Sequence, residues 1–405
     1  MNSLSTAFLK HVAQTSNDPI GLEVIRAHGA YIYTKDKKKY LDFISGIAVA
    51  SLGHTHPKVV EAICQQAKQY LHVMVYGEYL FAPQVRFAEK LASRLPSSLS
   101  SVYFTNSGTE AVEGALKLSK KFTGRKRLIG FSGSFHGDSH GSLSVTGRAV
   151  YRKPFAPLLP HVSFLPFNNL AALSKIDETV AAVITEPIQG EGGIIVPDKG
   201  FLKALAMRCR KVGALLILDE AQTGLGRTGK LFAMEHFNMV PDILVLAKSL
   251  GGGMPLGAFI SSSKIMKTLS ENPPLSHVTT FGGHPVCCAA GLAHLDIILK
   301  KNIVKRVDTM GNKIMTFLNR LIGQYPNVLA GVRGMGLMIG LEFQAEKTCV
   351  RFVKQAREMG LLLGFTLHTS KVVRIAPPFT LSDREMNAGL KMIERVCDGL
   401  SVVEN

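Results

Sequence analysis

The sequence predicts an α/β fold with a mostly parallel sheet, and the spacing of its apolar runs carries this prediction. Short, β-rich apolar runs recur through the middle of the chain, at residues 101–105, 127–132, 181–187, 214–220 and 242–248. Helix-length amphipathic segments lie between them, at residues 108–123 and 199–212. Buried strands that alternate with helices are typical of a parallel sheet with helices on both faces.

The two ends of the chain have a different pattern from the middle. Residues 29–43 (GAYIYTKDKKKYLDF) are typical of a small hairpin, whereas residues 300–395 contain long helical stretches around GVRGMGLMIGLEF and KVVRIAPPF. We therefore expect residues 51–295 to form a large domain. We expect residues 1–50, as an N-terminal segment, to join residues 296–405 in a second, smaller α+β domain.

The composition indicates a folded protein and argues against several other classes. Of the 405 residues, 46% are hydrophobic and 19% are charged, which is ordinary for a globular chain. No apolar run is long enough to span a bilayer, and residues 1–19 lack the basic and apolar regions of a secretory signal. The six cysteines form no CxxC pair, which favours a reduced, cytoplasmic setting over a disulfide framework or a metal site.

The formal net charge of +17 is the unusual global property of this chain. Such a charge could attract nucleic acid, a membrane surface or anionic metabolites. Lys and Arg are spread along the chain, with short clusters at 35–40, 117–127 and 208–211. These clusters are typical of solvated helix faces and turns, so we predict neither a nucleic-acid partner nor a membrane partner.

Polar residues follow the ends of the predicted strands, where ligands bind in sheets of this kind. After residues 101–105, Ser107, Gly108 and Thr109 open a helix. The unpaired N–H groups of that helix could hold a phosphate, or the residues could form an ordinary N-cap. The other strand ends are followed by Phe135, His136, Glu186, Gln189, Glu191, Asp219, Glu220, Gln222 and Lys248.

Lys248 follows an entirely apolar strand, so desolvation should lower its pKa, as suits an amine that forms a Schiff base. The alternative is a structural ion pair between Lys248 and Asp219. One cofactor, pyridoxal 5'-phosphate, would use all of these strand ends together. Its aldehyde would bond to Lys248, and its ring would lie beneath Phe135. Its phosphate would lie on Gly108 and Thr109, and its pyridinium nitrogen would meet the buried carboxylate of Asp219.

Several motifs occur in the order found in class III (subgroup II) pyridoxal-phosphate aminotransferases. They are NSGTEAVEGALKL, FHG, EPIQGEGG, LDEAQTGLGRTG, AKSLGGGMPLGA and TTFGGHPVCCAA. The sequence thus resembles this family, which includes the acetylornithine, ornithine and 4-aminobutyrate aminotransferases, from residue 20 to residue 395. The resemblance implies a fold-type I homodimer with active sites at the subunit interface. It also implies amino transfer from an amino acid or ω-amine to 2-oxoglutarate.

The resemblance implies a role for each matching residue around the cofactor. Lys248 looks like the Schiff-base lysine and proton shuttle, and Asp219 looks like the partner of the ring nitrogen. The other implied cofactor-binding residues are Ser107, Gly108, Thr109 and the neighbouring subunit's Thr280 at the phosphate, Phe135 and His136 at the ring, Gln222 at the phenolic oxygen, and Glu186.

Two further residues resemble the substrate-binding residues of the family. Arg374 resembles the arginine that holds the α-carboxylate of glutamate or 2-oxoglutarate, a contact that suits a bidentate guanidinium. Glu191 resembles the glutamate that pairs with this arginine and releases it when a different substrate binds.

Three positions depart from the family pattern. Asp138 stands where acetylornithine and ornithine enzymes have the arginine that grips the substrate's far carboxylate, and Arg148 or Arg152 could replace that cation. Ala221 stands where Val or Ile usually packs on the cofactor ring, and His284 stands where Asn is usual. Asp138 leaves the amino donor open among N-acetylornithine, ornithine, 4-aminobutyrate or another ω-amino acid, and a diamine.

Other readings compete with this one. An aminomutase or a racemase uses the same fold, but the pair of Glu191 and Arg374 argues against both. The FHGD sequence is closer to diaminopelargonate-type transaminases. A non-enzymatic basic protein that binds nucleic acid or acts as a scaffold is the reading from a different class.

Overall fold

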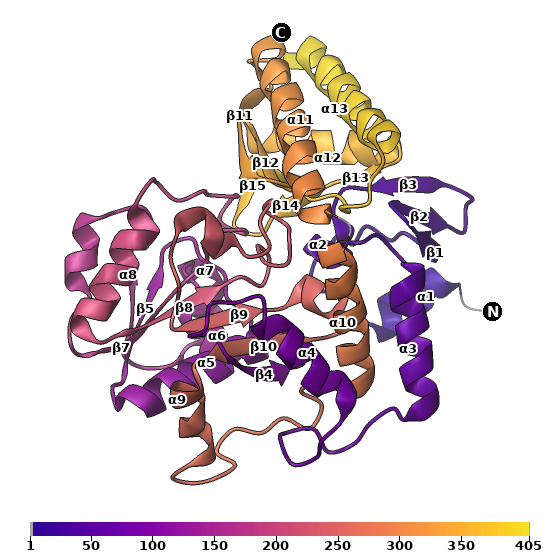
Figure 1. Cartoon of the computed structure of the whole chain (residues 1–405). Coiled ribbons are helices and arrows are strands. Elements are labelled where there is room, and N and C mark those ends of the chain that lie inside the picture. Colours follow the sequence, from indigo (N-terminus) through magenta and orange to yellow (C-terminus); the bar gives the residue numbers. More distant parts are fainter. Residues whose placement is uncertain (1–2, 301, 405) are drawn as a thin grey trace.

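A seven-stranded sheet forms the centre of the computed structural model, which describes residues 3–300 and 302–404 (Figure 1). Its strand order is β4-β10-β9-β8-β7-β5-β6. The strands are β4 (Ser101–Thr105), β5 (Arg127–Phe131), β6 (Val162–Leu165), β7 (Val180–Thr185), β8 (Leu215–Asp219), β9 (Ile243–Leu246) and β10 (Gly257–Ser261). Strand β10 pairs antiparallel with β4 and β9, and the other pairs are parallel. The predicted α/β fold with a mostly parallel sheet is confirmed.

Helices cover both faces of this sheet. Along β8, Ile217 belongs to the same core cluster as Ala115 of α5 (Gly108–Thr123). The next residue, Leu218, belongs to a separate cluster with Leu205 of α8 (Phe201–Val212). Because side chains alternate along a strand, α5 and α8 lie on opposite faces, as the two predicted helices require.

The sequence did not predict two strands of this sheet. Strand β10 follows the glycine-rich turn SLGGGMPLG, and β6 has only four residues. Short runs bounded by turn residues give a weak periodic signal, so their pairing partners decide that they become strands.

Two four-stranded sheets stand beside the central one. The first has the order β1 (Val24–His28), β2 (Tyr31–Thr34), β3 (Lys39–Asp42), β13 (Leu361–Leu362). The second has the order β11 (Leu329–Met335), β12 (Met338–Phe343), β15 (Thr369–Ile375), β14 (Gly364–Thr366). The predicted hairpin is confirmed as the antiparallel pair of β2 and β3. Parallel pairing of β3 with β13 joins the N-terminal segment to the C-terminal part of the chain.

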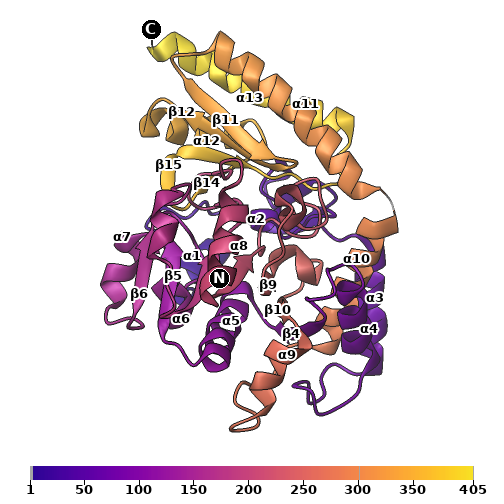
Figure 2. The same ribbon diagram turned by 60° about the vertical axis from the view of Figure 1, so that its left-hand side comes forward.

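Further helices surround these sheets. They are α1 (Leu4–His11), α2 (Ser45–Ala48), α3 (Pro57–Gln69), α4 (Ala82–Ala92), α6 (His140–Val145), α7 (Ala149–Arg152), α9 (Ser263–Met266), α10 (Pro285–Lys300), α11 (Ile303–Gln324), α12 (Glu346–Glu358) and α13 (Asp383–Glu404). Short 3-10 helices are η1 (Lys153–Phe155), η2 (Ala171–Lys175), η3 (Ala233–Phe237), η4 (Lys248–Gly251) and η5 (Lys267–Ser270). Figure 2 shows α11 and α13 along the outer side of β11, β12 and β15. In the part of the chain that the structure describes, no helix is both long and apolar enough to cross a membrane.

The proposed domain bounds remain a prediction. The bound between residues 295 and 296 lies inside helix α10, which continues to Lys300. Helix α10 packs on α3 and α4 along its length and also contacts α11.

Candidate active site

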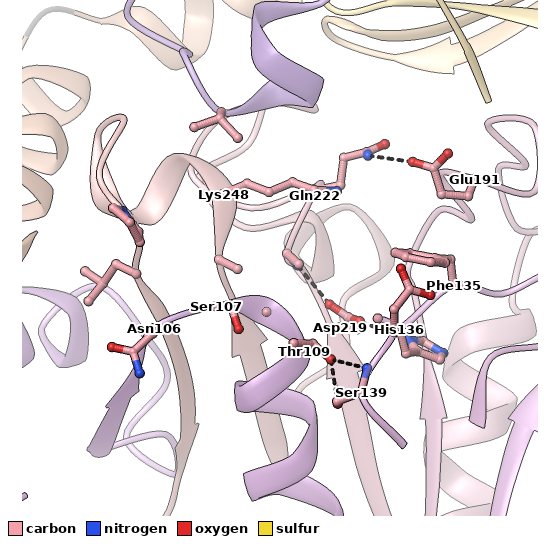
Figure 3. Close-up of a pocket in the computed structure, with 18 of the residues that line it drawn as sticks. Asn106, Ser107, Thr109, Phe135, His136, Ser139, Glu191, Asp219, Gln222 and Lys248 are labelled. Carbon is pink, nitrogen blue, oxygen red and sulfur yellow. Dashed lines mark hydrogen bonds and ion pairs between the residues drawn. The ribbon is translucent and has the colours of Figure 1, made fainter. Parts of the chain in front are cut away.

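A cavity of about 590 Å³ opens at the carboxyl end of the central sheet. Residues that follow β4, β5, β7, β8 and β9 line it (Figure 3). Every residue predicted from the sequence to bind the cofactor lines this cavity except Thr280. Val49, from the N-terminal segment, lines it as well, and no feature of the sequence indicated that.

Lys248 is buried at the point where β9 ends and η4 begins. Its φ of +50° lies in the left-handed region, which a non-glycine residue adopts at an energetic cost and which is concentrated at functional sites. Burial lowers the pKa of the Lys248 amine, and the nearby charge of Glu191 only partly opposes this shift. Figure 3 shows the side chain extending across the cavity toward Gln222. A buried amine with a lowered pKa is a suitable nucleophile toward an aldehyde.

Asp219, the last residue of β8, has His136 as its side-chain partner. The distance between Asp219 Oδ2 and His136 Nδ1 is 2.8 Å, and Asp219 Oδ1 accepts from the Ala221 N–H at 3.0 Å. Among the described residues, no ion pair within 4.0 Å joins Lys248 to Asp219, so the alternative of a structural ion pair is wrong. Each carboxylate oxygen can accept a second hydrogen bond, and Asp219 lines the cavity, so it can still receive a cationic group there.

The N-terminus of α5 forms another wall of the cavity. The Ser107 side chain accepts from the Glu110 N–H at 3.3 Å, so the N-cap that the sequence indicated is present. The N–H groups of Gly108 and Thr109 begin the helix and have no acceptor within it. A Cβ added at Gly108 would come within 3.1 Å of the Ala247 Cβ, so this backbone lies close to the cavity floor.

Hydroxyl groups extend this wall. Thr109 Oγ1 lies 2.7 Å from Ser139 Oγ and 2.6 Å from Ser142 Oγ. Ser139 also lines the cavity, although the sequence analysis did not select it. Its only signal was its position in the polar stretch GDSHGS after the FHG motif. The wall offers N–H and O–H donors to an anion.

Glu186 holds the loop that carries Phe135. Its Oε1 accepts from the Phe135 N–H at 3.0 Å, and its Oε2 accepts from the Gly190 N–H at 2.8 Å. Burial raises the pKa of Glu186 to about 7. Its contacts with the main chain suit a residue that positions the Phe135 ring at the cavity.

Glu191 and Arg374 form a buried ion pair between Glu191 Oε1 and Arg374 Nη2. Burial would raise the pKa of Glu191, but the charges of Arg374 and Lys248 outweigh it and lower the pKa. Gln222 Nε2 lies 3.5 Å from the same Glu191 oxygen. Glu191 lines the cavity, whereas Arg374 stands behind it in β15. The structure thus brings together two residues that are 183 positions apart.

The departures from the family pattern have separate positions. Asp138 is exposed and lines the cavity, but neither Arg148 nor Arg152 does. The Arg152 guanidinium lies 3.9 Å from the centre of the Phe164 ring, and that of Arg148 lies 5.8 Å from the centre of the Tyr151 ring. Ala221 lines the cavity. His284 stacks on His72 outside it, with ring centres 5.6 Å apart.

The residues present fit pyridoxal phosphate. A buried amine, a buried carboxylate and a helix N-terminus face one cavity, which matches an aldehyde, a pyridinium nitrogen and a phosphate. The Gln222 Oε1 atom is buried and has no hydrogen-bond partner among the described residues, so this amide has unused capacity at the cavity. Phe135 and Ala221 supply apolar surface on the lining for a flat ring.

Comparison with known proteins identifies the family. The model of the class III aminotransferases matches residues 12–397. An ornithine aminotransferase from Toxoplasma gondii is 29% identical, has a TM-score of 0.91, and the match covers 98% of this chain and 94% of that one. A transaminase from the marine bacterium Virgibacillus is 26% identical, with a TM-score of 0.93 and 100% of both chains covered. A thermostable (S)-enantioselective omega-transaminase from Thermomicrobium roseum is 28% identical, with a TM-score of 0.89 and 97% of both chains covered.

The match over nearly the whole chain agrees with the geometry of the cavity. The chain therefore belongs to the class III aminotransferase family, and it is a pyridoxal-phosphate-dependent transferase of the ornithine and omega-transaminase type.

Proposed function

We propose that this enzyme moves an amino group from an ω-amine donor to 2-oxoglutarate, in two half-reactions that share one cavity. The observation that carries the proposal is the buried pair of Glu191 and Arg374 at the edge of the cavity.

The pair supports a dicarboxylate as the amino acceptor. A guanidinium can hold a carboxylate through two parallel hydrogen bonds, and the buried Arg374 Nε atom has no partner in the part of the chain that the structure describes. When a carboxylate approaches, Glu191 has to turn aside so that Arg374 can receive it. When the donor lacks a carboxylate at this point, Glu191 neutralises Arg374 and the cavity accepts an uncharged chain.

The cavity wall supports a donor without a carboxylate at its far end. Lys248 is the sole lysine or arginine among the described residues that line the cavity. Asp138 adds a negative charge to the same wall. While Arg374 stays paired with Glu191, a far carboxylate would meet repulsion from Asp138 and find no free cation, so a diamine fits this paired state better than N-acetylornithine or 4-aminobutyrate.

The side chains around the cofactor have distinct tasks in this proposal. Pyridoxal phosphate, when bound, supplies the electron sink for the transfer. Lys248 holds the cofactor and then moves a proton at the substrate's α- or ω-carbon. Asp219, whose carboxylate is held in place by His136, would stabilise the positive charge on the ring nitrogen of the cofactor. Phe135 and Ala221 would exclude water from the part of the cavity that receives the cofactor ring.

We also propose a homodimer with shared active sites. Thr280 is exposed and does not line the cavity of its own chain, which supports a contact with the cofactor phosphate of a second copy. Exposed apolar side chains nearby in the chain, Val278 and Phe281, support a covered surface there. Sedimentation of the purified enzyme tests the dimer, and Thr280→Ala should weaken cofactor retention in it.

The function is tested by single-turnover mixing of the cofactor-loaded enzyme with separate amino donors. We expect glutamate and 1,4-diaminobutane to remove the visible absorbance of the bound cofactor. N-acetylornithine and 4-aminobutyrate should react about 100-fold more slowly, because a carboxylate without a partner costs roughly 3 kcal/mol. Fast reaction of N-acetylornithine would contradict the proposed donor.

The variant Arg374→Gln tests whether Arg374 is needed for glutamate and not for the diamine. This variant should lose about 100-fold in kcat/KM with glutamate, because the bidentate contact is gone, and should keep its rate with 1,4-diaminobutane. Formation of an isomer of the donor, without a keto acid, would indicate an aminomutase or racemase instead.

A further inference from the structure

The tight turn between β14 and β15 contacts Glu191 directly. The Leu367 N–H donates to Glu191 Oε2 at 2.7 Å, and the His368 N–H donates to the Glu191 main-chain oxygen at 3.0 Å. Arg374 occupies the other side-chain oxygen, Oε1. Both carboxylate oxygens of Glu191 are therefore held, one by a side chain and one by the main chain of this turn.

The Tyr151 side chain and the main chain at Gly133 hold the turn itself. The Tyr151 hydroxyl, in α7, donates to the Leu367 main-chain oxygen at 2.7 Å. His368 Nδ1 lies 3.0 Å from the Gly133 main-chain oxygen. Since that oxygen can only accept, Nδ1 carries the proton and the His368 ring has a fixed orientation.

The rings around this turn pack in a row. His368 stacks on Tyr151, with ring centres 5.2 Å apart and planes 24° apart. It also meets Phe135 edge-on, with ring centres 6.1 Å apart. Because His368 is buried and Phe135 lines the cavity, the row connects the hydroxyl of Tyr151 to the wall of the active site.

We infer that Tyr151 is a positioning residue that sets how readily Glu191 releases Arg374. The inference rests on the proposed function, in which a dicarboxylate needs a free Arg374. To turn aside, Glu191 has to break its bond to the Leu367 N–H as well as its bond to Arg374. Tyr151 keeps that N–H in place, so it stabilises the state in which Arg374 is neutralised.

Loss of the hydroxyl should shift the balance between the two substrates. A hydrogen bond between neutral groups is worth a factor of about five in an equilibrium constant. In Tyr151→Phe the released state of Arg374 should therefore be about fivefold more populated, and a dicarboxylate should bind about fivefold more tightly. A donor that uses the paired state should keep its KM, because that state still predominates.

The first readout does not depend on turnover. Glutarate is an unreactive dicarboxylate with the carbon chain of 2-oxoglutarate, and its binding to the cofactor-loaded enzyme can be measured by calorimetry. The matched control is Tyr103→Phe. The Tyr103 hydroxyl also donates to a main-chain oxygen, that of His277 at 2.9 Å, and Tyr103 does not line the cavity. Glutarate should bind more tightly to Tyr151→Phe and unchanged to Tyr103→Phe.

The second readout is the split between KM and kcat in each half-reaction. We expect Tyr151→Phe to lower the KM for glutamate about fivefold and to leave kcat, and the KM for 1,4-diaminobutane, unchanged. A merely structural role would raise both KM values or lower both kcat values. Unchanged or weaker glutarate binding in Tyr151→Phe would overturn the inference. The proposed function would still stand in that case, provided that the wild-type enzyme binds glutarate.

A double variant shows whether the effect passes through Glu191. In a Glu191→Gln background the charge on Glu191 is absent, so Tyr151→Phe should no longer alter glutarate affinity. A further fivefold change in that background would overturn the inference. If the wild-type enzyme neither binds glutarate nor reacts with glutamate, the proposed function fails and the inference fails with it.

Discussion

Two buried regions meet at the end of β8, and they satisfy their charged side chains in different ways. In the first, the cavity region, Asp219 pairs with His136 and Glu191 pairs with Arg374, so each carboxylate has one charged or ionisable side-chain partner beside its one main-chain N–H. In the second, the main-chain-bonded region, Glu220 accepts from the Ala233 and Met234 N–H groups at 2.6 Å and 2.8 Å. Arg227 belongs to this region too, since it donates to the Leu337 and Pro377 main-chain oxygens.

The comparison teaches that burial alone does not mark a functional carboxylate. Asp219 and Glu220 are adjacent and both are buried. A side-chain partner can turn away when a ligand arrives, whereas a main-chain partner is fixed by the fold. Glu186 lines the cavity but is bonded to the main chain, so its task is to hold Phe135.

The largest expected effect is on Lys248, in the cavity region. Lys248→Ala should lower the rate of transamination by about 10⁴-fold, because both the nucleophile and the proton carrier are lost. Single-turnover mixing with glutamate measures this loss. Borohydride reduction followed by peptide mass analysis should place the cofactor on Lys248 in the wild type, and the exposed Lys264 serves as the control. Turnover by Lys248→Ala at a rate close to that of the wild type would remove Lys248 from the mechanism.

The next effect is on Asp219. Asp219→Asn should slow the half-reaction with glutamate by about 10³-fold, because a neutral amide stabilises a positive charge in the cavity much less than a carboxylate does. The free energy of unfolding should change little, because the amide oxygen can keep the Ala221 N–H while the His136 ring moves its proton and Nδ1 accepts from the amide N–H. A similar rate for Asp219→Asn and wild type would show that the side-chain pair in the cavity region is only structural.

The corresponding change in the main-chain-bonded region is Glu220→Gln, which should act on stability instead. The NH₂ group of the new glutamine faces one of the two main-chain N–H groups, which then has no acceptor. The free energy of unfolding should therefore fall by about 2 kcal/mol. Activity per folded molecule should stay the same. The control is Glu235→Gln. Glu235 is exposed and accepts from the Phe232 N–H, so this variant should lower the free energy of unfolding by at most about 1 kcal/mol. Urea unfolding measures both, and an equal loss in the two variants would contradict the contrast.

The smallest effect is a pH dependence of stability. Burial raises the pKa of Glu220 from its ordinary value of 4.5 to about 7. A raised carboxyl pKa means that the folded state holds a proton that the unfolded state has lost. The contribution of Glu220 is therefore present below pH 4.5 and is lost as the pH rises to about 7.

Between about pH 5 and pH 6 this loss should amount to about 1 kcal/mol, and Glu220→Gln should remove it. Urea unfolding at each pH measures the difference between the two proteins. Glu186, whose pKa is also raised to about 7, should leave a similar slope in the variant. A difference between wild type and variant that does not depend on pH would show that Glu220 stays ionised in the folded protein.

Much of the fold followed from local sequence. Strands β7, β8 and β9 are buried at every residue, so their apolar runs were long enough to stand out. The start of α5 was visible in its cap, and the strand ends carried Asp219 and Lys248 to one edge. The rule that ligands bind at the carboxyl edge of such a sheet placed these two residues together before any contact was known.

The rest depended on contacts between distant parts of the chain. The bond between His136 and Asp219 spans 83 positions, so only the fold could reveal it. The turn at Leu367 and His368 has no motif of its own, and no local feature of the sequence shows that Val49 lines the cavity. Arg374 was found through family resemblance, because nothing in its local sequence says that it meets Glu191.

The pairing of β3 with β13 has a consequence for how the protein folds while it is being synthesised. Leu41 stands beside Leu361, and the Phe43 N–H donates to the Leu362 main-chain oxygen at 3.0 Å. Strand β3 leaves the ribosome about 320 residues before its neighbour, so this edge of the strand stays unpaired while the residues between them are made. Val49 follows this strand and lines the cavity, so one wall of the active site is carried by a segment whose pairing cannot form before residues 361–362 are made.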